Sequence, residues 1–399
     1  MSMFNIGLSG LKTTQKALEV TSNNIANSAT AGFKSGSAEF AAVYNGGQRG
    51  GVGVSDIKEN FAREGNVVNT GSALDLAITG KGFFVVSENG RMAYTQAGQF
   101  GLDKEQHIVN ASGNRLQGYG IDANGNLIPG VLTDLKVEAA NIPAEATTEI
   151  SFALNLSSAS DVIAVPFDPL DGSSYNYSQS TEMFDSLGNS HTLTQYFVHN
   201  GAGSWDAHYY VNGTALPAPF DTAALSFDVN GQLTVPAAPA NIALEFAPAG
   251  AALMSFNVNM TASTQFGSGF NIYNNDADGY TAGEFAGVSI AETGQVFATF
   301  TNGETKLQGQ VVLANFANVN GLETGNKTVW YATNESGAPL YGTPDSGNLG
   351  ALLSGAYIGS NVDISEQLVD LMAFQQNYQA NAKTISNADE MMQILFSAT

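Results

Sequence analysis

The sequence predicts a mainly β protein with α-helices at both ends, and three features of its 399 residues support this fold class. Both ends carry apolar residues at heptad spacing, which is typical of coiled-coil-like helices that pack along one seam. Asn-Gly pairs divide the middle into short alternating segments, as in antiparallel hairpins. A block without basic residues lies inside that middle. We therefore expect a discontinuous multidomain chain, with paired terminal helices and two antiparallel β domains nested one inside the other.

The helices are predicted over about residues 4–27 and 363–396, where apolar side chains recur every seventh residue. In each helix one row of the seam is apolar throughout, whereas the second row contains Gln15 and Ser22, or Gln375 and Asp389. A self-sufficient coiled coil would place apolar residues in both rows. Packing of the two helices within one chain is the alternative, but the half-polar rows and the Asn-rich end of the first helix favour a seam that is completed only by neighbouring copies. The proposed subunit contacts along the seam are Phe4, Leu8, Leu11, Leu18, Ile25, Ile364, Leu368, Leu371, Tyr378, Ile385 and Met392.

The end of the first helix is rich in asparagine. Asn23, Asn24 and Asn27 are poor helix formers because their amides compete for nearby backbone groups, so we expect them to make specific hydrogen bonds. Gly32 is predicted to end the turn that follows. At the other end of the chain, Asp363 and Glu366 have the spacing of a capping box at the start of the second helix.

The middle of the chain is predicted to form hairpins. Leu225, Phe227 and Val229 alternate up to Asn230-Gly231, and the apolar alternation continues on the other side, which is typical of a hairpin with one buried face. The segments around Asn89-Gly90 and Asn302-Gly303 have the same pattern. These turns predict mostly antiparallel β structure between the helices.

Charge is distributed unevenly along the chain. Residues 137–305 contain seventeen acidic residues and no Lys or Arg, which accounts for most of the net charge of −22. Such a segment, bounded by sequence of mixed charge, indicates an inserted domain. The expected parts are a helical assembly domain (1–32 and 360–399), an extended linking arm (33–70), a first β domain (71–146 and 285–359) and an outer acidic β domain inserted in it (147–284).

The acidic block also restricts the partners. Nucleic acid is not expected to bind, because phosphate groups require Lys and Arg to replace their counterions. If copies of residues 137–305 face one another, no cation from that block can form an ion pair between them. We therefore hypothesise polar, hydrated contacts that exchange at little cost.

Composition excludes several further classes. No stretch reaches the roughly 18 apolar residues of a membrane span, and membrane insertion is not expected. The first residues lack the basic and apolar regions of a cleaved signal peptide. The chain has no cysteine, which excludes disulfides and thiolate chemistry.

The search for catalytic or metal-binding residues favours structural explanations. His191, His199 and His208 lie in a stretch with the pattern of β strands, so a metal or catalytic role is not favoured. Asp276 and Asp278 belong to a segment that looks like the start of a calcium loop but lacks the Asp at its first position and the Glu at its twelfth, so a turn is favoured and cation binding stays open. We predict no enzymatic activity, cofactor or metal.

Several motifs resemble those of the bacterial flagellar axial proteins, which form the rod and hook. The pattern Asn-Ile-Ala-Asn-x-x-Thr-x-Gly-Phe is similar to their N-terminal signature, and the segments 76–100, 307–316, 346–350 and 360–385 extend the likeness over nearly the whole chain. The likeness is strongest to the hook proteins, because the shorter distal rod subunits lack the insert 147–284. The signature residues are Asn24, Ile25, Ala26, Asn27, Thr30, Gly32 and Phe33.

The resemblance implies a structural subunit of the flagellar hook. It implies self-assembly into a curved, flexible tube that acts as a universal joint and transmits motor torque from rod to filament. The implied partners are other copies of the chain, the hook cap scaffolding protein, the distal rod and hook-filament junction proteins, and the flagellar type III export apparatus. The implied location is the extracellular hook of the flagellar basal body, reached without a cleaved signal peptide.

Two alternatives remain at this point. The chain could be another axial part, such as a distal rod or hook-filament junction subunit. Less favoured is a flagellar scaffold that carries an enzymatic or adhesive outer domain. Under the seam hypothesis, a polar substitution at Leu11 or Leu371 should abolish polymerisation and leave the central β domains folded.

Overall fold

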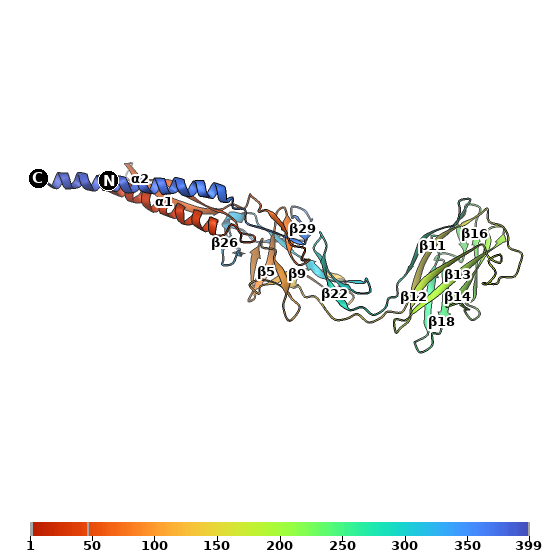
Figure 1. Cartoon of the computed structure of the whole chain (residues 1–399). Coiled ribbons are helices and arrows are strands. Elements are labelled where there is room, and N and C mark those ends of the chain that lie inside the picture. The colour runs from red at the N-terminus through yellow and green to blue at the C-terminus, as the bar shows by residue number, and fades with distance from the viewer. Residues whose placement is uncertain (1–2, 46–47, 398–399) are drawn as a thin grey trace. The chain divides into compact units, whose positions relative to one another are not determined.

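A computed structural model describes residues 3–45 and 48–397 of the chain. The chain divides into two compact units. Unit 1 comprises Met1–Ala139, Gly287–Thr299 and Thr305–Thr399, and unit 2 comprises Ala140–Ala286 and Phe300–Glu304. The predicted fold class is confirmed: one helix stands at each end of the sequence, and the elements between them are mostly β strands (Figure 1).

The two predicted helices are present within one or two residues of the expected bounds. Helix α1 is Met3–Ala26 and helix α2 is Ile364–Ser397. They lie side by side in unit 1, and α2 continues past the start of α1 (Figure 1). In the described residues, neither helix has the length and apolar character needed to cross a membrane.

The segment expected to be an extended arm contains a paired structure. Strands β1 (Gly36–Asn45) and β2 (Gln48–Glu59) form a two-stranded antiparallel hairpin with two register shifts. The hairpin packs against α1. Pairing satisfies the backbone groups that a single extended strand would leave to solvent. The glycine-rich stretch that suggested an arm includes residues 46 and 47, which lie outside the described part of the chain.

Most of the remaining strands, apart from those of the two sheets in unit 2 described below, pair in antiparallel fashion. Among described residues, thirteen of them form one sheet, with the central order β22-β23-β24-β9-β5-β6-β27-β26, and β3-β30 and β4-β29 form two small sheets. The bounds are β3 Val67–Asn69, β4 Leu76–Thr79, β5 Phe83–Glu88, β6 Arg91–Thr95, β7 Phe100–Leu102, β8 Ile108–Asn110, β9 Arg115–Ile121, β10 Leu127–Asp134, β22 Phe285–Ile290, β23 Gln295–Phe300, β24 Thr305–Val311, β25 Leu313–Asn315, η1 Val319–Gly321, β26 Glu323–Thr324, β27 Trp330–Tyr331, β28 Leu340–Gly342, β29 Ala351–Ser354 and β30 Ala356–Ile358.

An aromatic cluster holds the β part of unit 1 together. Phe83 lies edge-on to Phe61, Phe316 and Trp330, with ring centroids 5.7 to 5.8 Å apart. This is the preferred geometry of aromatic pairs. Trp330 also donates a hydrogen bond from Nε1 to the carboxylate of Glu59, at the end of β2, so the cluster is tied to the hairpin.

Unit 2 is a sandwich of two sheets. One has the order β18-β19-β11-β20 with β21 on the other edge of β11, and the second has the order β12-β13-β14-β16-β17 with β15 beside β14. The bounds are β11 Glu149–Ser157, β12 Tyr177–Phe184, β13 Ser190–Gly201, β14 Ser204–Val211, β15 Thr214–Ala215, β16 Thr222–Phe227, β17 Leu233–Val235, β18 Asn241–Phe246, β19 Met254–Asn259, β20 Thr264–Phe266 and β21 Asn271–Ala277.

The two sheets of unit 2 enclose one apolar core. Phe152 of β11 stacks on Phe197 of β13, and Trp205 and Tyr209 of β14 are fully buried beside them. The predicted hairpin through Asn230-Gly231 is present as β16 and β17. One feature was not expected: β11 pairs in parallel with β19 and then with β20, so the sheet is not wholly antiparallel.

Candidate functional site

The two helices contact each other through small and polar side chains. The buried residues of α1 recur at spacings of three and four, which places them on one face. A Cβ atom built on Gly7 would lie 2.8 Å from the Ile385 side chain of α2, so a larger residue at position 7 would force Ile385 to move. The buried stripe consists of Gly7, Gly10, Thr14, Ala17, Thr21 and Asn24, with Thr13 beside it.

Specific contacts fix the antiparallel register of the helices. Gly7 faces Ile385 and Gly10 faces Asn381. The Asn381 amide donates a hydrogen bond of 3.4 Å to the Thr14 hydroxyl. At the other end, Asn24 Nδ2 donates to Gln367 Oε1 over 2.8 Å. The chain therefore pairs its own helices, which the sequence had not favoured, and it does so through small and polar residues rather than through the predicted seam.

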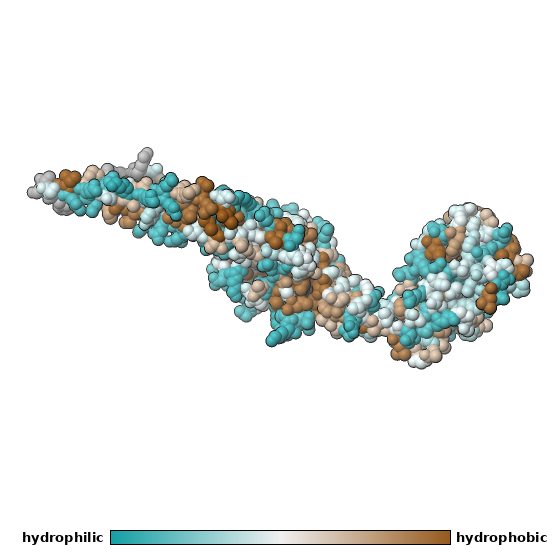
Figure 2. Space-filling model, viewed as in Figure 1, coloured by the Kyte–Doolittle hydropathy of each residue, from teal (hydrophilic) through white to brown (hydrophobic). Residues whose placement is uncertain are grey.

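The predicted apolar seam lies largely outside this contact. The residues that are at least 37% exposed are Phe4, Leu8, Ile364, Leu368, Tyr378 and Met392. Those that are half-buried are Leu11, Leu18, Ile25, Leu371 and Ile385. Ile385 faces Gly7 of the same chain. Part of its side chain therefore serves the contact within the subunit, and only the rest is available to a neighbour. Figure 2 shows apolar side chains gathered on the helical part of unit 1.

The signature at the end of α1 forms the joint between the helices and the hairpin. The Asn24 side chain is 2% exposed and bonds both backbone groups of Gly36: its Oδ1 accepts from the N–H over 2.9 Å and its Nδ2 donates to the carbonyl over 2.8 Å. Asn27 and Thr30 bond to each other inside the turn. Gly32 has a φ of +69°, and a Cβ there would lie 2.4 Å from the backbone N of Ala97. Ile25 and Phe33 are half-buried and Ala26 is exposed.

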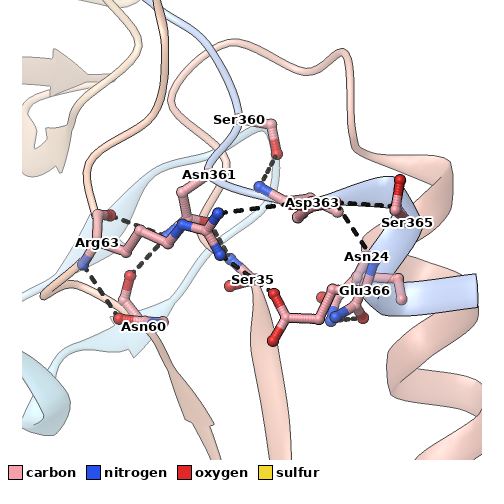
Figure 3. Close-up of polar contacts among 11 residues, drawn as sticks. Asn24, Ser35, Asn60, Arg63, Ser360, Asn361, Asp363, Ser365 and Glu366 are labelled. Carbon is pink, nitrogen blue, oxygen red and sulfur yellow. Dashed lines mark hydrogen bonds and ion pairs between the residues drawn. The ribbon is translucent and has the colours of Figure 1, made fainter. Parts of the chain in front are cut away.

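A second buried asparagine completes the joint (Figure 3). Asn361 Oδ1 accepts from the Ser35 N–H over 2.7 Å, and its Nδ2 donates to the carbonyls of Asn60 and Arg63 over 2.8 and 2.9 Å. The segment before α2 is thereby bonded to both ends of the hairpin. Buried amides with all partners satisfied fix one geometry, because any other leaves polar groups unpaired.

Charged groups surround the start of α2 (Figure 3). Asp363 Oδ1 accepts from the N–H of Ser365 and of Glu366, so Asp363 caps the helix as predicted. Glu366 instead bonds Arg63, with 3.2 Å between Oε2 and Nη1. The cap is therefore one-sided among described contacts. Nearby, burial lowers the pKa of Lys34, although the carboxylate of Glu64 opposes this effect.

The histidines singled out in the sequence have structural partners. His191 bonds the buried carboxylate of Asp185, with 3.1 Å between Nε2 and Oδ2. His199 Nδ1 lies 2.9 Å from the Ser160 carbonyl, and His208 stacks on Phe167 with ring centroids 4.0 Å apart. Each of the three histidines thus contacts a different partner within unit 2.

The segment that looks like the start of a calcium loop has a structural role instead. Asp276 lies in β21. Asp278 uses both carboxylate oxygens to accept from Thr148 and Glu149. In the described part, ligand atoms of His, Asp and Glu come within 4.8 Å of one another at Asp103, Glu105 and His107, in the turn between β7 and β8.

Sequence reasoning identified Asn24 but missed the buried stripe and Arg63. The stripe had a detectable signal, since Gly7, Gly10, Thr14 and Ala17 recur at helical spacing. The stripe was missed because helix contacts are usually apolar, and the heptad pattern therefore selected the large apolar residues instead of the small ones. Nothing in the sequence singled out Arg63, whose partners lie about three hundred positions away in the chain.

Four family models match the chain in order. They are described as "Flagella basal body rod protein" (residues 4–34), "Flagellar hook protein FlgE/F/G D1 domain" (77–155), "Flagellar basal body protein FlaE D2 domain" (153–280) and "Flagellar basal body rod FlgEFG protein C-terminal" (353–398).

Relatives match over the full length. Flagellar hook protein FlgE of Escherichia coli is 38% identical and that of Salmonella typhimurium 37%, each alignment covering 98% of both chains. The crystal structure of Helicobacter pylori flagellar hook protein FlgE2 has a TM-score of 0.55 and 13% identity, covers 73% of this chain and all of that chain, and supports the fold. The chain belongs to the flagellar hook protein family and is a structural subunit of the bacterial flagellar hook.

Proposed function

We propose that the chain polymerises through the exposed apolar residues of α1 and α2, which form the wall of a tube. The observation that carries this proposal is the division of the helical surface. The helices bury Gly, Thr, Ala and Asn between them and leave Phe4, Leu8, Ile364, Leu368 and Met392 in solvent. Large apolar side chains that gather in solvent at both ends of a helix pair favour an interaction surface. The eleven seam residues named from the sequence remain our proposed subunit contacts.

The polymer is a curved, flexible tube that transmits torque from rod to filament. Its proposed partners are the hook cap scaffolding protein, the distal rod and hook-filament junction proteins, and the type III export apparatus, through which the chain passes without a cleaved signal. Membership of the hook protein family supports these assignments. The alignments cover 98% of the length of two hook protein relatives, which favours a hook subunit over a rod or junction subunit. We propose no catalytic activity for the chain.

Flexibility is proposed to reside in unit 2. We retain the four-part division of the chain, in which residues 147–284 form the outer domain. Because residues 137–305 contain no Lys or Arg, contacts between copies of this block are polar and hydrated. Tube curvature should then respond to ionic strength. Curvature that is unchanged between low and high salt, or a large apolar contact between outer domains, would rule this out.

Polymers grown from the purified protein test the proposal. Negative-stain electron microscopy should show curved tubes of uniform diameter, because identical heterologous contacts repeat around a closed wall. The proposal is contradicted if the protein stays monomeric at high concentration and high salt although its helices are folded, since misfolding would then not explain the failure.

A further inference from the structure

An apolar groove lies between the helices and the hairpin of unit 1. It has a volume of about 730 Å³ and is lined by three elements: α1, the β1-β2 hairpin and α2. Its apolar wall includes Phe40, Val43 and Tyr44 of β1, which are 43%, 46% and 65% exposed. Side chains of this kind in solvent leave hydrophobic surface available for a partner.

The groove carries no charged residue among those that line it. It is also continuous with the internal helix contact, because Gly10, Thr14 and Asn381 belong to both. A segment that binds there would therefore extend the existing helical packing. The occupant must be apolar and uncharged, since a charge placed against this surface would lose its hydration without gaining a partner.

The end of α2 has these properties. The register of Gly7 with Ile385 means that α2 continues past the start of α1, as Figure 1 shows. Ala388 is the last buried residue of α2, and the described side chains that follow it are exposed. Met391 and Ile394 are 48% and 66% exposed and lie three positions apart, on one face. Residues 391–397 contain no charged side chain.

The geometry points to one occupant for the groove: residues 391–397 of α2 from a second copy of the chain. An apolar helix end that projects beyond its own partner enters a groove beside the paired helices of the next copy, with Met391 and Ile394 directed at Phe40, Val43 and Tyr44. This is the helix-in-groove mode of recognition. The inference rests on the proposed polymerisation and names the surfaces that meet within it.

Engineered cysteines test the contact in the full chain, which has no cysteine of its own. The double variant Val43→Cys/Ile394→Cys is polymerised, oxidised and run on a non-reducing gel. A ladder of covalent oligomers that disappears with reductant is expected. An intrachain disulfide would not produce a ladder. The matched control is Val43→Cys/Leu170→Cys, because Leu170 is 93% exposed in unit 2 and outside the groove; this pair should give no ladder.

The outcomes separate this inference from the proposed function. Tubes without a ladder, or an equal ladder from the control pair, overturn the inference and leave polymerisation intact. Failure of the unmodified chain to polymerise counts against the proposed function. If only the cysteine variant fails to assemble, oxidative footprinting of unmodified tubes decides. Oxidation of Met391 and Tyr44 should fall several-fold relative to the monomer, and unchanged oxidation of either residue overturns the inference.

Discussion

The terminal helices and unit 2 arrange the same kinds of side chain in opposite ways. Unit 2 buries Phe152, Phe197, Trp205 and Tyr209 in one core between its two sheets. The helices bury glycine, threonine and asparagine against each other and expose Phe4 and the other large residues. Burial of apolar area is the main favourable term in folding. Unit 2 therefore carries its stabilising surface inside, whereas the helices keep much of theirs for neighbours.

This difference explains how one chain can hold a fixed fold and remain ready to assemble. A helix pair joined through small residues can form within the subunit at a close approach, and the larger side chains remain available on the outside. The joint is specified by buried amides, Asn24 and Asn361, rather than by a core. Hydrogen bonds of this type fix geometry and contribute modest stability.

The largest effect on stability should follow truncation of the unit 2 core. Trp205 is fully buried, so Trp205→Ala should lower the free energy of unfolding of unit 2 by about 3–5 kcal/mol. Leu368→Ala in the helices should change the stability of the monomer by less than about 0.5 kcal/mol, because Leu368 is 47% exposed. Hydrogen exchange of the two units measures both. If both substitutions lowered the free energy of unfolding by a similar amount, the helices would depend on their large apolar residues as much as unit 2 does.

A smaller effect is expected at the joint. Asn24→Ala leaves the N–H and carbonyl of Gly36 without their partners and should cost about 2 kcal/mol locally. Amide exchange should accelerate in the hairpin and in the first turns of α2, with unit 2 unchanged. The matched variant is Asn23→Ala, whose side chain is exposed. Equal exchange in both variants would show that Asn24 does not hold the joint.

Acid should affect unit 2 through one buried carboxyl. Burial alone would raise the pKa of Asp185, but hydrogen bonds from Asn189, His191 and the Leu187 N–H hold it well below its usual value. A depressed folded pKa gives stability that is present above the unfolded pKa of about 3.9 and is lost as pH falls toward the folded value. Unit 2 should therefore lose stability below about pH 4.

The variant Asp185→Asn tests this account. It should lower the stability of unit 2 at neutral pH by about 1–3 kcal/mol, since an ionised acceptor is replaced by an amide at a buried site. Its denaturant midpoint should fall less steeply below pH 4 than that of the parent chain, because the titrating group is gone. An identical pH profile would assign the acid sensitivity to other carboxyls.

The smallest effect is expected for the ion pairs at the start of α2. The side chains of Arg63, Asp363 and Glu366 are 51%, 46% and 61% exposed. Solvent screens such pairs, and Arg63→Gln should cost less than about 1 kcal/mol, with the difference vanishing in high salt. Exchange in the first turns of α2 at two salt concentrations measures it. A large cost that salt does not reduce would mean that these charges are more important to the joint than the amides.

The sequence predicted the elements better than their contacts. Heptad spacing predicted both helices to within two residues, and Asn-Gly predicted the hairpins at 230, 89 and 302. Local signals suffice for these because periodicity and turn geometry are written in adjacent residues. The hairpin β1-β2 was not expected, since glycine-rich sequence indicates flexibility as readily as close packing. The face used between the helices was missed because small residues give no strong hydropathy signal.

Two matched leucines test most directly whether the helices keep their apolar surface for neighbours. Leu368→Asp and Leu170→Asp each place a charge at an exposed leucine, the first on α2 and the second in unit 2. Sedimentation and electron microscopy under polymerising conditions should find Leu368→Asp monomeric with unit 2 folded, and Leu170→Asp assembled into tubes like the parent chain. Tubes formed equally well by Leu368→Asp would contradict the account.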